Sequence, residues 1–135
     1  MSEEASTVIA RNLERMPATF GAALSIHELR GQSASLNPNS VFTAREPHFV
    51  LELIGTVAKL EDAKDAVDWI TTFWEEMKKI DPENILESTY ISLTPPEHLD
   101  LSKIYASNLE TIKDLKREYD PENAFNLAIP RIKRA

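Results

Sequence analysis

The sequence predicts an α+β fold in which a small antiparallel sheet is backed by helices on one face. Two observations support this prediction. First, three long segments have apolar residues at three- and four-residue spacing, which is typical of amphipathic helices. Second, shorter segments between them alternate apolar and polar residues, which is typical of half-buried strands. The expected order along the 135 residues is helix, strand, strand, helix, strand, helix, within a single domain spanning 1–135.

Helices are expected over residues 3–16, 61–79 and 100–118, with Ser2 and Asp100 as N-caps of the first and the third. Their apolar stripes are Ala5, Val8, Ile9, Leu13 and Met16 in the first helix; Ala63, Ala66, Val67, Ile70, Phe73, Trp74 and Met77 in the second; and Leu101, Ile104, Tyr105, Asn108, Ile112 and Leu115 in the third. The spacing places both Trp69 and Trp74 in the core.

Strands are expected over residues 20–29, 49–57 and 87–94, with a loop over 31–40 between the first two. In the second strand the apolar residues Phe49, Leu51, Leu53 and Val57 share one face. The helices should cover this face, which leaves the opposite face of the sheet open. Strand parity places Glu52 and Tyr90 on the open face.

Composition excludes several classes of function. The chain has no cysteine, so it has no disulfide, thiolate metal site or nucleophilic thiol, and with three scattered histidines we expect no metal and no cofactor. The net charge of −7 disfavours broad binding to nucleic acid or an anionic membrane. The acidic start and the lack of a long apolar run indicate a cytoplasmic protein without a secretory signal.

Several segments resemble one family, the berberine-bridge-type FAD-linked oxidases. The segment 45–55 (REPHFVLELIG) is similar to that family's "hR-x-x-x-y-x-l" strand, Val67-Asp68-Trp69-Ile70 to its "N-x-x-W-v" helix, and Thr89-Tyr90-Ile91-Ser92 to its "Y-x-N" strand. The closing run, Tyr105 and Asn108 followed by 115–132 (LKREYDPENAFNLAIPRI), is similar to "Y-G-x-N-x-x-r-L-x-x-x-K-x-x-y-D-P-x-N-x-F-r-x-x-q-s-I" and is the most specific match. The segment 25–31 is a weaker match to a strand end.

The resemblance implies the C-terminal part of a substrate domain, standing alone without an FAD-binding domain. Two positions depart from the family pattern, because Ser92 stands where the family has Asn and Ala106 where it has Gly. Both departures suggest that constraints related to the flavin are relaxed. In the family the open sheet face lines the substrate pocket, and a strand carboxylate acts there as a general base in some members.

Three residues are therefore candidate catalytic groups. Glu52 is the expected acid/base, because a carboxylate on an apolar sheet can exchange protons with a substrate. Tyr90 can donate a hydrogen bond to a developing oxyanion, although it can equally be an aromatic side chain that covers the sheet. His27 can shuttle protons, but a lone histidine on a strand is more often structural. The expected substrate-binding residues are Ser25, Val50, Ile54, Ser92 and Asn108. For Asn108, a structural amide that ties a loop to its helix is the stronger interpretation.

The preferred hypothesis is a cofactor-independent enzyme of the isomerase, cyclase or lyase type that acts on a small natural-product intermediate of secondary metabolism. The alternatives are the substrate-domain lobe of a split FAD-dependent oxidoreductase and a non-catalytic binding remnant. We also expect a homodimer, because an open sheet face and unpaired strand edges favour self-association across a two-fold axis.

Overall fold

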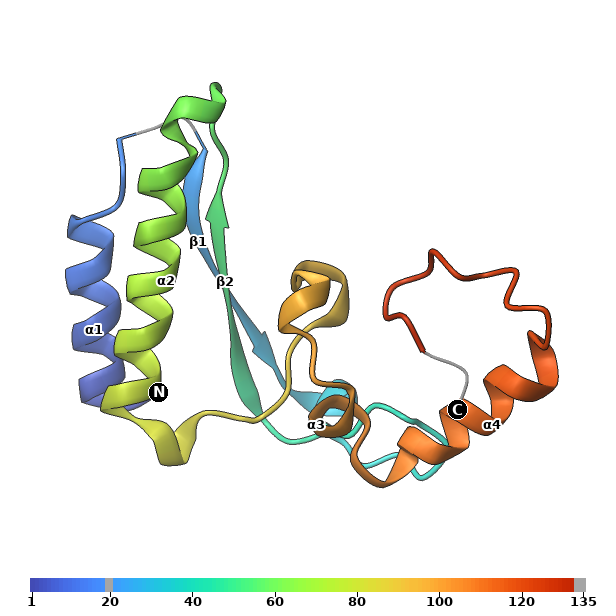
Figure 1. Cartoon of the computed structure of the whole chain (residues 1–135). Coiled ribbons are helices and arrows are strands. Elements are labelled where there is room, and N and C mark those ends of the chain that lie inside the picture. Colours follow the sequence, from blue (N-terminus) through green and yellow to red (C-terminus); the bar gives the residue numbers. More distant parts are fainter. Residues whose placement is uncertain (19–20, 133–135) are drawn as a thin grey trace. The chain divides into compact units, whose positions relative to one another are not determined.

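The computed structural model describes residues 1–18 and 21–132 (Figure 1). These fall into two compact units, which are described separately below. Unit 1 comprises residues 1–29 and 48–85, and unit 2 comprises residues 30–47 and 86–135. Unit 1 contains α1 (Glu3–Glu14), β1 (Ala22–Leu29), β2 (His48–Gly55) and α2 (Ala63–Ile80); unit 2 contains α3 (Leu101–Tyr105), α4 (Leu109–Tyr119) and short 3₁₀ turns. The α+β class is confirmed.

The two strands of unit 1 form an antiparallel pair with a continuous register from Ala22 opposite Gly55 to Leu29 opposite His48. The expected first two strands are thus confirmed within two residues at each end, except that Phe20 lies outside the described residues. Gly55, the last residue of β2, lies against Ala66 and Ile70 of α2. A Cβ atom placed there would lie 2.8 Å from Cδ1 of Ile70, so a glycine allows the strand to pack against the helix.

Both helices of unit 1 cover the same face of the strand pair, as expected (Figure 1). The core consists of Ala5, Val8, Ile9, Trp69, Phe73 and Met77, with Leu24, Leu51, Leu53 and Ile70 packed against it. The rings of Trp69 and Phe73 meet edge to face at a centroid distance of 5.9 Å. Leu51 and Leu53 belong to the strand face that the alternation pattern assigned to the core.

The first helix begins as its sequence predicts. The hydroxyl Oγ of Ser2 accepts a hydrogen bond from the backbone N–H of Ala5 at 3.1 Å and donates one to the carboxylate of Asp81 at 2.5 Å. Since Asp81 follows the last residue of α2, Ser2 both caps α1 and ties its start to the end of the neighbouring helix.

The stripe predicted for α2 is confirmed at Ala66, Phe73 and Met77 and is wrong at Val67 and Trp74. Trp69 is buried at 5% exposure, as expected, but Trp74 is 42% exposed and Val67 is 58% exposed. The buried side of α2 runs through Ala66, Trp69, Phe73 and Met77. Apolar residues therefore occupy a broad arc of the helix, of which only a part is covered. Outside the core, Nζ of Lys78 lies 5.3 Å from the centroid of the Trp74 ring.

The expected third strand over 87–94 does not form. In the described part of the chain the sheet has two strands, and Ile91–Leu93 is a 3₁₀ turn. The backbone N–H of Leu93 and the hydroxyl of Thr94 both donate to the carbonyl of Tyr90, at 3.0 and 2.9 Å. Local hydrogen bonds of this kind compete with a strand ladder, and Pro95 and Pro96 then provide no N–H donors.

The expected third helix is interrupted. Asp100 caps α3 by accepting from the backbone N–H of Ser102 at 3.0 Å, as predicted, but α3 ends at Tyr105. Ala106 has φ 45° and ψ −123°, a conformation that an α-helix cannot contain, and the chain passes through a 3₁₀ turn before α4 begins at Leu109. Beyond α4, the carboxylate of Asp120 accepts hydrogen bonds from the backbone N–H groups of Ala124 and Phe125, so this side chain stabilises the turn.

Candidate functional site

Five of the eight predicted site residues lie on one face of the β1–β2 pair. The register places Ser25 directly opposite Glu52 and His27 directly opposite Val50, and Ile54 lies two residues beyond Glu52. Directly opposed residues of an antiparallel pair project to the same side, and side chains two apart along a strand share a face. Since Leu24, Leu51 and Leu53 occupy the other face and pack against the core, this set lies on the face away from the helices.

Glu52 and His27 make direct contact across the two strands. Nε2 of His27 lies 3.3 Å from Oε2 of Glu52. The two residues are diagonal neighbours, because His27 is opposite Val50 and Glu52 is the next residue on that face of β2. Side-chain exposure is 56% for His27 and 23% for Glu52, so the carboxylate is the more enclosed partner of the pair.

The remaining three predicted residues belong to unit 2. Tyr90 precedes the 3₁₀ turn that contains Ser92, and the Tyr90 side chain is 56% exposed. The strand parity that placed Tyr90 with Glu52 has no basis, because residues 87–94 do not form a strand. Asn108 ends the 3₁₀ turn before α4, and its side-chain Nδ2 donates to the carbonyl of Val41 at 3.3 Å. This bond ties a loop to the start of the helix, which agrees with the structural interpretation of Asn108.

The same loop has a second anchor and a stacked arginine. Oγ1 of Thr43 donates to the carbonyl of Ile104 at 2.9 Å. The guanidinium of Arg45 lies 5.6 Å from the Phe42 ring centroid and donates to the carbonyl of Ser33 at 3.2 Å. These contacts anchor the loop within unit 2.

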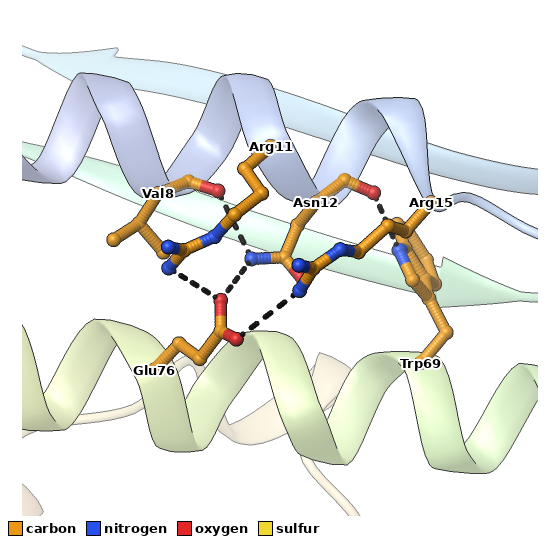
Figure 2. A network of polar contacts seen from close by, with 6 residues as sticks. All are labelled: Val8, Arg11, Asn12, Arg15, Trp69 and Glu76. Carbon is orange, nitrogen blue, oxygen red and sulfur yellow. Dashed lines mark hydrogen bonds and ion pairs between the residues drawn. The ribbon is translucent and has the colours of Figure 1, made fainter.

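A polar network between α1 and α2 was not predicted from the sequence (Figure 2). The carboxylate of Glu76 accepts hydrogen bonds from Asn12 Nδ2 at 2.8 Å, from Arg11 at 2.9 Å and from Arg15 at 3.4 Å. These donors, with Asn12 first, lower the pKa of Glu76. Asn12 is buried at 1% exposure, four residues after Val8 on the covered side of α1. A polar residue at that helical spacing is the signal that reveals a buried partner.

A second residue of α2 joins the network. Nε1 of Trp69 donates to the backbone carbonyl of Asn12 at 2.9 Å. Figure 2 shows that these side chains bridge the two helices and that each contact joins one residue of the network to another. We therefore regard the network as structural.

The described residues offer no cluster of side chains for a metal ion, and their helix N-termini carry acidic residues. They contain no group of three or more histidine, aspartate or glutamate side chains arranged to bind a metal ion. The pyrophosphate of a dinucleotide is usually bound at a helix N-terminus. Here α1 begins with Glu3 and Glu4, α2 carries Asp65 and α4 carries Glu110 in the first turn, all of which repel a phosphate. FAD therefore does not fit these helix ends.

No helix within residues 1–18 and 21–132 combines the length and the apolar character that a bilayer crossing requires. One shallow groove runs along α2 and is lined by Thr71, Thr72, Glu75, Glu76, Lys78 and Lys79. All these residues come from a single helix, and the groove does not include any predicted site residue. A second groove, of about 340 Å³, lies in unit 2 between α4 and residues 125–132.

One comparison with known proteins gives a relative. The chain is 27% identical over 119 residues to the FAD-linked oxidoreductase aurO of Gibberella zeae, and the match covers 88% of this chain and 23% of aurO. This is a distant homology, and the chain spans about a quarter of the length of that relative. No protein-family model matches the chain, and no solved structure matches it. The expected relation to FAD-linked oxidases is thus confirmed at the level of distant homology to one FAD-linked oxidoreductase.

Proposed function

We propose that the chain is a substrate-domain lobe of an FAD-linked oxidoreductase of the berberine-bridge type. The FAD is held by a different part, in the same polypeptide or in a separate one. The similarity to aurO over 88% of the chain is the observation that carries this proposal. Because the helix ends of both units repel a phosphate, the proposal assigns to this chain the substrate and not the dinucleotide.

The surface of unit 2 supports a role as one part of a larger protein. Its apolar side chains Leu115, Tyr119, Phe125, Leu127 and Ile129 are 45–78% exposed. They lie within fifteen residues of one another along α4 and the segment after it. Single exposed apolar residues are ordinary on a soluble protein, but a cluster of large ones usually marks a surface that another molecule covers.

The open strand face supports the same proposal. An isolated strand pair is only marginally stable in water, and here the packing against α1 and α2 stabilises it on one face. In unit 1 the strand pair is covered on one side, and Val50 and Ile54 lie on the other beside Glu52 and His27. Small-molecule sites are lined mainly by apolar side chains with a few polar groups, and this face carries both kinds of residue. The proposed ligand of this wall is an intermediate of secondary metabolism.

The contact between His27 and Glu52 favours a second candidate, the cofactor-independent isomerase, cyclase or lyase. Acid/base chemistry of that kind requires positioned proton donors and acceptors, and this pair is such a group without any flavin. A non-catalytic remnant would require neither the pair nor a flavin partner. The oxidoreductase lobe therefore requires a flavin for turnover, the cofactor-independent enzyme turns over without a flavin, and the remnant does not turn over at all.

The test is purification of the tagged chain from its native source, followed by flavin absorption and by chromatography of the acid-released cofactor. The proposal predicts FAD in fixed ratio to the chain, together with the polypeptide segment that binds it. The control is the same chain produced alone in a heterologous host, which should be colourless as purified and again colourless after incubation with FAD and removal of the unbound FAD by gel filtration. A colourless native preparation that converts pathway intermediates would establish the cofactor-independent enzyme, and one that is colourless and inert would leave the remnant.

A further inference from the structure

We infer that His27 accepts a proton from the ligand on the open strand face and that Glu52 is its positioning residue. This inference rests on the proposed function only in assigning that face to a substrate. The sequence suggests Glu52 as the acid/base; here His27 takes that role and Glu52 positions the His27 ring. The contact of Nε2 of His27 with Oε2 of Glu52 at 3.3 Å is its starting point.

The tautomer of His27 determines which ring nitrogen can accept a proton from a ligand. An ionised carboxylate can only accept hydrogen bonds, so the hydrogen of this contact is on Nε2 of His27. A neutral imidazole carries one hydrogen, and Nδ1 therefore keeps its lone pair and is the nitrogen that can accept a proton from a ligand. When it does, the imidazolium is stabilised by the carboxylate that already contacts the ring, as in other carboxylate–histidine pairs.

The exposure of the two side chains also favours His27 as the proton acceptor and Glu52 as its positioning residue. The His27 side chain is 56% exposed, whereas that of Glu52 is 23% exposed and lies directly opposite Ser25. The more accessible ring is the group that a ligand meets first. Val50, directly opposite His27, supplies apolar surface beside it. The other diagonal neighbour of His27 is His48, so a test must separate these two histidines.

The experiment uses a probe reaction because the natural ligand is unidentified. In 5-nitrobenzisoxazole, a base removes the proton on C3, the N–O bond breaks, and a nitrile and a coloured phenolate form in one step. The reaction requires no oxidant and no cofactor, so the chain can be assayed alone. The excess rate over buffer is measured for the wild type and for His27→Gln, Glu52→Gln, His48→Gln, His98→Gln and Glu28→Gln.

The inference predicts a characteristic order of effects. His27→Gln removes the excess rate, because the base itself is lost. Glu52→Gln lowers kcat about tenfold and leaves KM unchanged, because the partner orients and stabilises the imidazolium without touching the probe. His48→Gln keeps most of the rate. Two matched controls keep the full rate: His98→Gln, in a 3₁₀ turn of unit 2, and Glu28→Gln, on the other face of β1.

Three results would overturn the inference. Loss of the excess rate in Glu52→Gln with retention in His27→Gln would make the carboxylate the base. A raised KM with unchanged kcat in Glu52→Gln would place Glu52 against the probe. A wild-type rate equal to that of His27→Gln would show that the ring accepts no proton. Circular dichroism of each variant confirms folding. Since no flavin takes part, a missing FAD partner would refute the proposed function without changing these rates.

Discussion

The indole nitrogen of Trp69 donates a hydrogen bond to the backbone carbonyl of Asn12 at 2.9 Å, which joins the middle of α2 to the last turn of α1 (Figure 2). Because α1 ends at Glu14, the carbonyl of Asn12 is among the last four of the helix and lacks the usual helical donor. The neighbouring helix provides that donor. The side chain of Asn12 and the carboxylate of Glu76 make a second connection between the same two helices.

Replacing Trp69 by phenylalanine should therefore destabilise unit 1. The substitution keeps an aromatic ring in the core but leaves the buried carbonyl of Asn12 without its donor, a loss of about 1–3 kcal/mol in the free energy of unfolding. Urea unfolding followed by circular dichroism measures it. Trp74→Phe is the matched control, because Trp74 is 42% exposed, and its effect should be below about 1 kcal/mol. Equal losses in the two variants would contradict the role given to the indole N–H.

The lowered pKa of Glu76 predicts how the network responds to acid. Its causes are, first, the hydrogen bond from Asn12 and, after that, the contacts with Arg11 and Arg15. A carboxylate whose pKa is lower in the folded state stabilises the fold above its ordinary value of 4.5, and this contribution is lost as the pH falls through the lowered pKa. The stability difference between the wild type and Glu76→Gln should be constant at neutral pH and shrink in acid. A stability difference that does not change with pH would contradict this role of Glu76. High salt should reduce the stability difference, because it screens the contacts with Arg11 and Arg15.

Unit 1 was largely predictable from its pattern. The caps, the two strands and the covered face all follow from local spacing, because Leu51 and Leu53 alternate with Glu52 and Ser2 precedes an acidic first turn. The side of α2 that is buried was not predictable. Apolar residues occupy a broad arc of this helix, and the position of α1 decides that Trp69 is covered and Trp74 is not. The grouping of Ser25, His27, Val50, Glu52 and Ile54 followed from strand parity, but the contact of His27 with Glu52 required the register.

Unit 2 shows where local pattern fails. Residues 87–94 alternate like a strand, yet a strand requires a partner with which to exchange backbone hydrogen bonds, and alternation does not specify one. The hydroxyl of Thr94 and the amide of Leu93 bond locally to Tyr90 instead. In the same way the stripe from Leu101 to Leu115 has helical spacing, and nothing in its composition marks the break at Ala106. The available signal was the resemblance to the berberine-bridge-type oxidases, in which a glycine stands at the position of Ala106.

Ala106→Gly should stabilise unit 2. With φ 45° and ψ −123°, Ala106 has a backbone conformation that favours glycine, and such a residue carries strain of about 1–3 kcal/mol. Glycine removes the strain but gains freedom in the unfolded chain, so the net stabilisation is about 1 kcal/mol. Hydrogen exchange of the α3 and α4 amides measures it. The same substitution at Ala10, an exposed position inside α1, should instead destabilise by about 1 kcal/mol. Faster exchange of the α3 and α4 amides in Ala106→Gly would contradict the assignment of strain.

The last prediction concerns assembly of the chain when it is produced alone. β1 and β2 pair with each other, and in the described part of unit 1 the helices cover one face of the pair and leave Val50 and Ile54 on the other. Exposed strand edges and a partly apolar face favour association, and a two-fold axis lets one surface cover itself. We expect a homodimer, so light scattering after size exclusion should give about twice the 15.3 kDa of one chain. Val50→Glu, on the open face, should dissociate it, while Phe125→Ser, in unit 2, should not. A mass of one chain at micromolar concentration would exclude the homodimer, and the FAD-bearing part would then be the partner that this face requires.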